Sequence, residues 1–336
     1  MRDKKSGSKT IRNFMKILHL FSSKVFAGLE RHVEELSYEQ SKNNQVVVIG
    51  PERFKNRFRA NYKAINTNRW RFSPILWLEL RDAMAKINPD IVHSHGQKMT
   101  NIIKADLHFS TIHGTKKNVS AFKKSKFIFG ASAKSLEHIS PKKSMVLENW
   151  VDENRFSNFK KISPEYFLYV GRFEPVKNPE RLIRAWKPDY GKLLMVGGGS
   201  LEKNLKTLIH DLKLDDTIEM RPETNDVASL LSKACALIIS SDREGSPKIL
   251  YESLYCNVPV LSTDCGNISE VLPKEFIADI NDESFKKLIS NWTSNIEELT
   301  SSQQTSFKRV KDNNLLSIQA EKVNKKYQEF LSIASK

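Results

Sequence analysis

The sequence lacks the short motifs that identify several large classes of protein. It contains no G-x4-G-K-[ST] segment, which argues against a P-loop NTPase, and no G-x-S-x-G segment, which argues against an α/β hydrolase. No apolar run approaches the roughly 18 residues that a transmembrane helix needs. The basic N-terminus is followed by an apolar stretch that is too short for a secretory signal and has no small-residue cleavage site.

Cysteine is also scarce. The chain has 3 cysteines in 336 residues, and their spacing fits no metal site. Cys235, Cys256 and Cys265 fall in or beside segments that we expect to be buried. Because buried free thiols are typical of a reducing compartment, we expect a cytoplasmic protein.

Positive charge is plentiful but unevenly distributed. The formal net charge is +15; residues 1–150 contain 28 Lys/Arg and 12 Asp/Glu, a net of +16, and residues 151–336 contain 26 and 27, a net of −1. This asymmetry predicts an anionic partner for the first half, such as nucleic acid, anionic lipid or a phosphorylated glycan. No zinc-finger spacing or RNA-recognition motif is present, which favours lipid or glycan.

Apolar strands alternate with helical segments in both halves, which predicts an α/β protein with parallel sheets. The strand at 15–21 leads through a loop containing Gly28 into a helix at about 29–42. A glycine there would let the backbone approach a phosphate closely. His95 and His113 end two further strands, so we expect both at the carboxyl edge of the sheet, where ligands bind.

Two cations follow the first strand of the second half. Arg172 ends that strand, and Lys177 lies five residues later, just before an expected helix. Arg can bind two oxygens of a diphosphate at once, and Lys adds a point charge, so the pair predicts a diphosphate site. Gly197 and Gly198 follow the next strand, and Arg221 follows the one after it. The alternative is a pair of solvated loop cations.

A strand–loop–helix pattern occurs twice within residues 236–272. Glu244 lies in the first loop, and Glu252 lies eight residues later, in a helix that begins near Pro247. Carboxylates at these positions suit the hydroxyls of a sugar nucleotide, and the free N–H groups at the helix start suit its phosphates. The alternative is an N-terminal capping acid followed by a salt-bridged helix glutamate.

These motifs resemble those of the retaining glycosyltransferases of family 4, and above all the E-x7-E block of that family. The block is matched by Glu244-Gly245-Ser246-Pro247, Glu252, Val258-Pro259-Val260 and Gly266 with Glu270. The G-R-x4-K segment that ends at Lys177 is a second match. Asn149, Asp152 and Phe156 resemble the interdomain segment of the family, in which Trp150 replaces the usual glycine.

The resemblance implies the GT-B architecture. In this architecture two Rossmann-like domains have parallel sheets that face each other across a cleft, and a C-terminal helix crosses back to the first domain. The implied divisions are a disordered basic tail at 1–11, an N-terminal acceptor-binding domain at 12–150, a C-terminal nucleotide-sugar-binding domain at 151–313 and a closing helix at 314–336. We expect the last helices over about 282–299 and 314–334.

The resemblance also implies roles for individual residues. The implied catalytic residues are Glu244, His113, Arg172 and Lys177, and the implied acceptor-binding residues are His95 and His113. The implied donor-binding residues are Gly28, Arg172, Lys177, Gly197, Gly198, Arg221, Glu244, Gly245, Ser246, Pro247, Lys248 and Glu252. No D-x-D motif for a metal-bridged diphosphate occurs, so we expect no metal and no cofactor besides the nucleotide-sugar substrate, for which a UDP-sugar is the expected form.

Residues 53–81 intersperse Arg and Lys with aromatic residues. Such a segment can stack on single-stranded nucleic acid, or it can dock on a bilayer with its aromatics at the level of the headgroups. Alternatively, the aromatics belong to the core. We favour an anionic membrane surface, with no nucleic-acid partner, and expect it to be contacted by Arg57, Arg59, Trp70, Arg71 and Trp77.

Together, the motifs predict a retaining, metal-independent glycosyltransferase on the inner face of the cytoplasmic membrane. Its expected acceptor is a lipid-linked glycan or one of the lipopolysaccharide or O-antigen type. One alternative is another GT-B enzyme with a soluble substrate, such as a nucleotide-sugar epimerase or a sugar-phosphate glycosyltransferase. The other is a nucleic-acid-binding protein on a degenerate scaffold.

Overall fold

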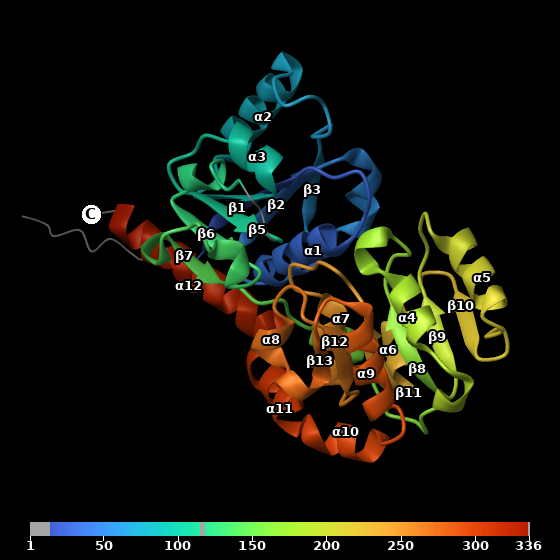
Figure 1. Ribbon diagram of the computed structural model, residues 1–336. Coiled ribbons are helices and arrows are strands. Elements are labelled where there is room, and N and C mark those ends of the chain that lie inside the picture. Colours follow the sequence, from blue (N-terminus) through green and yellow to red (C-terminus); the bar gives the residue numbers. More distant parts are fainter. Residues whose placement is uncertain (1–13, 115–117, 335–336) are drawn as a thin grey trace, which may run out of the picture. The chain divides into compact units, whose positions relative to one another are not determined.

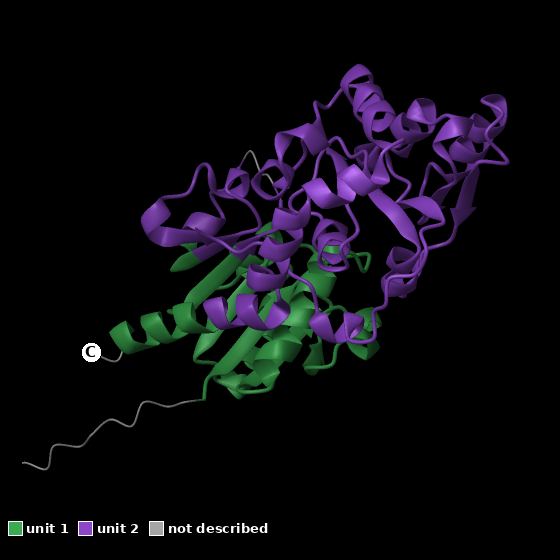
Figure 2. Cartoon of the chain, turned by 90° about the horizontal axis from the view of Figure 1, so that it is seen from below, with its two compact units in different colours: residues 1–110, 124–127, 324–336 green, residues 111–123, 128–323 purple. Residues whose placement is uncertain are grey.

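The computed structural model describes residues 14–114 and 118–334, and it contains two parallel sheets with helices (Figure 1). The tail expected at 1–11 lies outside the described residues. Contacts within the chain divide it into two compact units (Figure 2). Unit 1 comprises residues 1–110, 124–127 and 324–336, and unit 2 comprises residues 111–123 and 128–323. The domain boundaries expected at 150 and 313 remain predictions.

The first sheet has 7 strands in the order β3-β2-β1-β4-β5-β6-β7. Its strands are β1 (Lys16–Phe21), β2 (Gln45–Gly50), β3 (Asn61–Ala64), β4 (Ile91–His95), β5 (His108–Ile112), β6 (Phe127–Gly130) and β7 (Ser144–Val146). Strand β1 pairs in parallel with both β2 and β4, as the alternation of strands and helices predicts.

The second sheet has 6 strands in the order β10-β9-β8-β11-β12-β13. Its strands are β8 (Tyr166–Val170), β9 (Leu193–Val196), β10 (Ile218–Arg221), β11 (Ala234–Ile239), β12 (Val260–Thr263) and β13 (Ile277–Ala278). The order reverses between β8 and β11, which are parallel neighbours. In open parallel sheets a ligand crevice forms at such a switch point, outside the carboxyl ends of the strands.

The helices expected at about 29–42, after Lys177 and from Pro247 are present, and the predictions fail in part near the C-terminus. They are α1 (Gly28–Ser41), α2 (Pro74–Ile87), α3 (Gln97–Ile102), α4 (Pro179–Ala185), α5 (Glu202–Asp211), α6 (Val227–Ser232), α7 (Lys248–Tyr255), α8 (Ile268–Val271), α9 (Asp282–Trp292), α10 (Ile296–Ser302), α11 (Gln304–Asn313) and α12 (Leu316–Ala334). The single helix expected over 282–299 was wrong. Its residues form α9 and α10, because the Asn295 side chain accepts a hydrogen bond from Glu298 N and so starts a new helix. Helix α11 was not predicted. In the described part of the chain, no helix is long and apolar enough to cross a membrane.

Helix α2 has clear start and stop signals and is apolar on more than its core face. The Ser73 hydroxyl caps its first turn, and Asn88 ends it in the left-handed conformation with a φ of 46°. Leu76, Leu80 and Ala83 are buried at helical spacing. Apolar side chains on other faces of the same helix, including Ile75 and Leu78, are exposed.

The core of unit 2 is formed by strand residues that are apolar on both faces, as in a sheet covered by helices on both sides. Leu237 lies in β11 and is completely buried, whereas Leu212 lies just after α5 and is 43% exposed. The two leucines therefore differ in burial and not in chemistry.

We expect Leu237→Ala to lower the free energy of unfolding by about 2–5 kcal/mol, because the truncation leaves a cavity in a packed core. The control Leu212→Ala should change it by less than about 0.5 kcal/mol, since its side chain is already largely in water. Urea denaturation followed by circular dichroism measures both values. Equal losses in the two variants would contradict the packing described here.

Candidate functional site

Three loops of unit 2 meet at the carboxyl edge of the second sheet. They follow β8, β11 and β12, which are sheet neighbours in the order β8-β11-β12. The Ser240 hydroxyl donates to the carbonyl of Lys177 at 3.0 Å, and the Thr263 hydroxyl donates to the carbonyl of Ser241 at 2.6 Å. Asp242 N donates to the Val176 carbonyl at 3.0 Å. These hydrogen bonds hold the loops in one arrangement.

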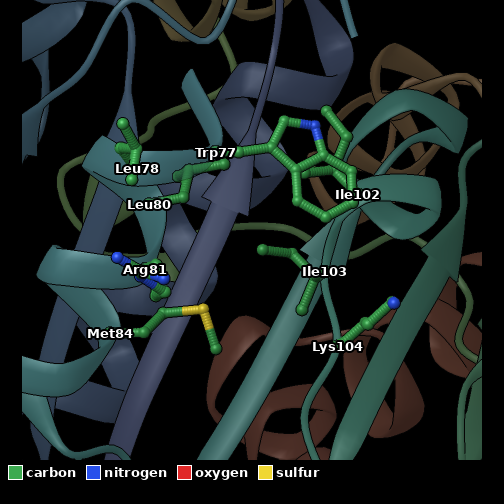
Figure 3. A pocket seen from close by; sticks show the side chains of 8 residues that line it. All are labelled: Trp77, Leu78, Leu80, Arg81, Met84, Ile102, Ile103 and Lys104. Carbon is green, nitrogen blue, oxygen red and sulfur yellow. The ribbon is translucent and has the colours of Figure 1, made fainter. Parts of the chain in front are cut away.

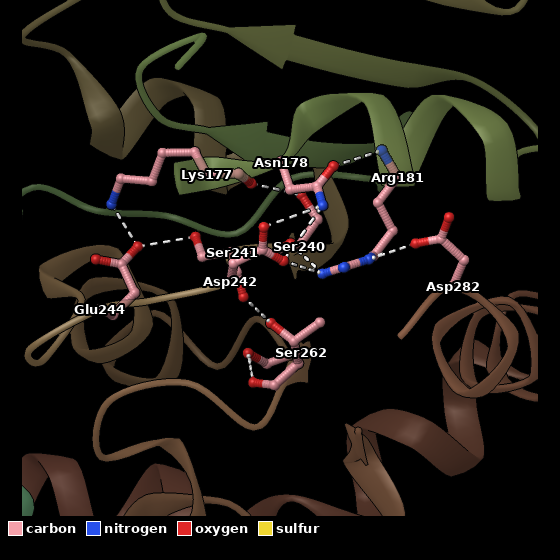
Figure 4. A network of polar contacts seen from close by, with 10 residues as sticks. Lys177, Asn178, Arg181, Ser240, Ser241, Asp242, Glu244, Ser262 and Asp282 are labelled. Carbon is pink, nitrogen blue, oxygen red and sulfur yellow. Dashed lines mark hydrogen bonds and ion pairs between the residues drawn. The ribbon is translucent and has the colours of Figure 1, made fainter. Parts of the chain in front are cut away.

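A buried arginine links the same loops to two helices (Figure 4). Arg181, in α4, is 7% exposed, and its Nη1 donates to the carbonyl of Ser240 at 3.1 Å. The guanidinium also pairs with Asp242 at 2.8 Å and with Asp282, the first residue of α9, at 2.9 Å. A buried guanidinium must have such partners, because removing one leaves a desolvated charge. The sequence patterns did not single out this residue.

The loops after β8 and β11 also bring Lys177 and Glu244 together. Their side chains form an ion pair, and the Ser241 hydroxyl donates to the same carboxylate oxygen, Glu244 Oε1, at 2.9 Å (Figure 4). The Lys177 side chain is 22% exposed and that of Glu244 is 12% exposed. Arg172 is exposed in the loop after β8, and its carbonyl accepts a hydrogen bond from the Tyr169 hydroxyl at 3.2 Å. Lys177, Arg172 and Glu244 therefore flank one edge of the sheet.

Close backbone contacts require glycine at two positions of the edge. A Cβ on Gly245 would lie 2.1 Å from the carbonyl oxygen of His113, a residue of the same unit. A Cβ on Gly266 would lie 2.7 Å from the carbonyl oxygen of Gly245, and Gly266 has a φ of +64°. Only glycine avoids both clashes. His113 therefore lies next to the loop that carries Glu244, although the two are far apart in sequence.

The loop before α7 is also held by the segment around residue 150. Pro247 is the N-cap residue of α7, and Lys248 is its first helical residue. Lys248 Nζ donates to the Trp150 carbonyl at 3.2 Å and lies 5.3 Å from the centre of the Trp150 ring. Asn149 Nδ2 donates to the Ser246 carbonyl. The fully buried Trp150 therefore takes up a packing role that the usual glycine could not have.

Glu252 is on the buried face of α7 and is already paired. It is 5% exposed, and its Oε1 accepts from Arg155 Nη1 at 2.9 Å. Arg155 Nη2 donates to the carbonyl of Asn225 at 3.1 Å. Arg155 was not recognised from the sequence, since nothing in the local pattern links it to a residue 97 positions away.

A hollow of about 430 Å³ lies beside the glycine-rich turn after β9. It is lined by Phe173, Gly197, Gly198, Glu202, Lys206, Met220, Arg221, Pro222 and Glu223. A volume of this size is in the range of small-ligand pockets. Arg221 Nε is 2.6 Å from Glu219 Oε1, so its guanidinium is held along the outer end of β10. The predicted residues Gly197, Gly198 and Arg221 are thus brought together.

In unit 1, Gly28 is the first residue of α1, and no atom lies within 4 Å of the position that its Cβ would take. His19 in β1 and His93 and His95 in β4 are buried, and their possible ligand atoms lie within 4.8 Å of one another, close enough to hold a metal ion. They form hydrogen bonds instead, His19 with His95 at 3.0 Å and with Gln40 at 2.7 Å, and His93 with Tyr327. Burial lowers the pKa of His19 to about 4, so its ring is neutral.

The basic aromatic segment divides between core and surface. Phe54 and Phe58 are buried, so for them the core alternative is correct. Trp70 is 70% exposed and Trp77 is 40% exposed. The predicted cations Arg57, Arg59 and Arg71 are all exposed but differ in their contacts. Arg59 pairs with Glu34 at 2.7 Å and lies over Tyr38, Arg57 lies over Phe26, and Arg71 lies over the exposed Phe72.

The fold is that of the GT-B glycosyltransferases. The structure of HepE from Anabaena in complex with UDP matches with a TM-score of 0.80 at 14% sequence identity, over 94% of this chain and 100% of that chain. Residues 151–309 match the family described as glycosyl transferases group 1, and the loops described above lie within these residues.

Two curated relatives match parts of the chain. The O-antigen chain mannosyltransferase RfbU of Salmonella typhimurium is 29% identical over 46% of this chain and 45% of its own length. The second is the N-acetylgalactosamine-N,N'-diacetylbacillosaminyl-diphospho-undecaprenol 4-alpha-N-acetylgalactosaminyltransferase of Campylobacter jejuni. It is 32% identical over 38% of this chain and 36% of its own length. The aligned part therefore spans less than half the length of either relative.

We expect Gly245→Ala to destabilise the protein by about 1–3 kcal/mol, because the added methyl group would overlap the His113 carbonyl and force the backbone to move. Gly198→Ala is the matched control, since no atom lies within 4 Å of that Cβ position. Thermal unfolding measures both variants. If Gly245→Ala melts at the same temperature as Gly198→Ala, the close contact is not present in solution.

Proposed function

We propose that the protein is a retaining, metal-independent glycosyltransferase that takes a sugar from a UDP-sugar. The observation that carries the proposal is the convergence of Arg172, Lys177 and Glu244 at the carboxyl edge of the second sheet, inside the matched residues 151–309. Cations and a carboxylate at such an edge suit the diphosphate and the hydroxyls of a sugar nucleotide. The UDP bound to the similarly folded HepE supports the choice of base.

The proposed reaction needs stabilisation of the charge that develops on the leaving diphosphate. Arg172 and Lys177 would provide this charge stabilisation, because fixed cations beside the leaving oxygens need little reorganisation. Glu244 would accept hydrogen bonds from hydroxyls of the donor sugar, next to the backbone of Gly245–Lys248. In the structure, Lys177 and Glu244 form an ion pair that compensates both charges. On donor binding, the Lys177 side chain would exchange its ion pair with Glu244 for one with the diphosphate. The Glu244 carboxylate would then be available to accept hydrogen bonds from the sugar hydroxyls.

The bond changes can be balanced without an enzymatic base. The bond between the anomeric carbon and the leaving phosphate oxygen breaks, and the acceptor hydroxyl oxygen forms the new bond on the same face. The proton of that hydroxyl passes to the leaving phosphate. His113, beside Gly245, would lie near the reacting centre. The Glu252 carboxylate would accept hydrogen bonds from the ribose as well as from Arg155.

The proposed acceptor is a lipid-linked or lipopolysaccharide-type glycan at the inner face of the cytoplasmic membrane. Three features support it: the net charge of +16 in residues 1–150, the exposure of Trp70, Phe72 and Trp77, and the diphospho-undecaprenol in the name of the Campylobacter relative. Anionic lipid attracts clustered cations, and aromatic side chains favour the headgroup level. His95 is buried beside His93, so its proposed part in acceptor binding is to orient neighbouring groups.

Without added metal, we expect UDP at one hundred times its Kd to stabilise the wild type by about 2.7 kcal/mol, seen as a rise in melting temperature. The double variant Arg172→Ala/Lys177→Ala should lose this rise, because both diphosphate cations are gone. Thermal-shift measurements with UDP, GDP, ADP and CMP test the base and the site together.

Arg184→Ala/Lys203→Ala is the charge-matched control for this experiment, since both side chains are exposed in unit 2. It should keep the full UDP shift. A shift that survives in Arg172→Ala/Lys177→Ala would place the diphosphate elsewhere. A shift that requires Mg²⁺ and vanishes in EDTA would overturn metal independence.

We expect the protein to sediment with vesicles that contain phosphatidylglycerol and not with vesicles of phosphatidylcholine alone. Trp70→Ser/Phe72→Ser should weaken this binding about tenfold or more, since two exposed aromatics are removed from the membrane-facing segment. The control Ile162→Ser/Leu212→Ser removes two exposed apolar side chains from unit 2 and should bind as the wild type does. Equal weakening by both double variants would argue against a specific surface.

A further inference from the structure

An apolar hollow lies along α2 in unit 1 (Figure 3). Its volume is about 290 Å³, and it is lined by Trp77, Leu78, Leu80, Arg81, Met84, Ile102, Ile103 and Lys104. The floor consists of core residues, since Leu80, Ile102 and Ile103 are 2%, 5% and 6% exposed. Leu78 at the rim is 55% exposed. We call this hollow the α2 groove.

A second, polar hollow is next to the α2 groove. It is lined by Trp70, Arg71, Gln97, Lys98 and Asn101, with a volume of about 490 Å³. Two features show that the hollows are neighbours. Trp77 Nε1 in the α2 groove donates to the Arg71 carbonyl at 2.9 Å, and consecutive residues of α3, Asn101 and Ile102, line one hollow each. The apolar groove thus lies next to a polar, cationic hollow.

The loop that carries Trp70 and Arg71 is fixed in place. Lys98 Nζ donates to the carbonyls of Thr67 and Arg69, at 2.6 Å and 2.5 Å. Arg69 in turn pairs with Glu79 of α2. The polar hollow therefore does not depend on the ordering of a loose loop when a ligand arrives, which lowers the entropic cost of binding.

The charges around both hollows favour an anion. Arg71 and Lys98 line the polar hollow, and Arg81 and Lys104 stand at the α2 groove. The acidic residues of α2 are compensated, because Glu79 pairs with Arg69 and Asp82 pairs with Lys86. Residues 1–150 as a whole carry a net charge of +16. A ligand with an apolar chain and a negative end group complements both the apolar lining and the cations of this surface.

We propose that the two hollows form one binding site for an amphiphile, with a hydrocarbon chain in the α2 groove and a phosphate head group beside Arg71 and Lys98. The occupant to which the proposal commits is the prenyl or acyl phosphate part of the acceptor. A flat bilayer surface would contact only the exposed rim, whereas the groove has a floor of core residues that only a chain can reach. The assignment of this lipid as acceptor rests on the proposed function; the binding itself does not.

The probe for the test is farnesyl phosphate in water, below the concentration at which it forms micelles, titrated into the full-length chain by calorimetry. Leu78→Asp should weaken binding about tenfold or more, because it places a negative charge at the groove rim. Ile75→Asp is the matched control, as it adds the same charge to another exposed position of α2. It should change the affinity less than about twofold.

The two parts of the ligand are tested separately. Arg71→Ala should weaken farnesyl phosphate about fivefold or more but leave the weaker binding of farnesol unchanged, since farnesol has no phosphate. Inorganic phosphate alone should bind much more weakly than farnesyl phosphate. Melting curves of each variant confirm that it folds.

Three outcomes would overturn the proposal. Equal weakening by Leu78→Asp and Ile75→Asp would mean that the groove itself is not used. Binding to anionic vesicles without binding of farnesyl phosphate would make the bilayer surface the partner. A dimer in sedimentation experiments that Leu78→Asp converts to monomer would make the groove an interface between copies of the chain. UDP binding is measured on the wild type in parallel, so failure of the donor site is seen independently.

Discussion

The edge of the second sheet where Lys177 and Glu244 meet depends on the buried guanidinium of Arg181. It joins the carbonyl of Ser240 after β11, the carboxylate of Asp242 in the same loop and the first turn of α9. Because a desolvated guanidinium is tolerated only with its partners in place, it makes one arrangement of these loops far more stable than others. The Lys177–Glu244 pair is built on that arrangement, since Ser240 and Ser241 connect the two loops.

The acidic side chains of the edge are paired with cations of the same chain. Lys177 is matched by Glu244, and Glu252 by Arg155. The cations of these pairs are partly exposed, since the side chains of Lys177 and Arg155 are 22% and 25% exposed, whereas the carboxylate of Glu252 is buried. The Arg181 network differs, because its guanidinium is itself buried. The edge therefore combines a buried support with cations that water can reach.

The positive charges of the first half of the chain have two kinds of surroundings in unit 1. Part of its positive charge is used internally, as in the Arg59–Glu34 pair. Another part lies around exposed apolar groups: Arg71 contacts Phe72, and Arg81 and Lys104 stand at the α2 groove. A surface that combines exposed apolar area with cations is costly for a protein in water alone, and suits an anionic amphiphile.

The sequence by itself determined the strands, many of the helices and much of the candidate edge. Apolar runs marked the strands, and motif spacing singled out Arg172, Lys177 and Glu244, since both signals are local. Only the tertiary structure decided the rest. Arg181 and Arg155 meet partners 59 to 101 positions away, and Trp150 packs under Lys248, so no local pattern reports them. Likewise, two aromatic residues of the same basic segment differ in burial: Phe54 lies in the core and Trp70 lies on the surface. Burial depends on which face of the segment the folded chain covers, and the local sequence does not report this.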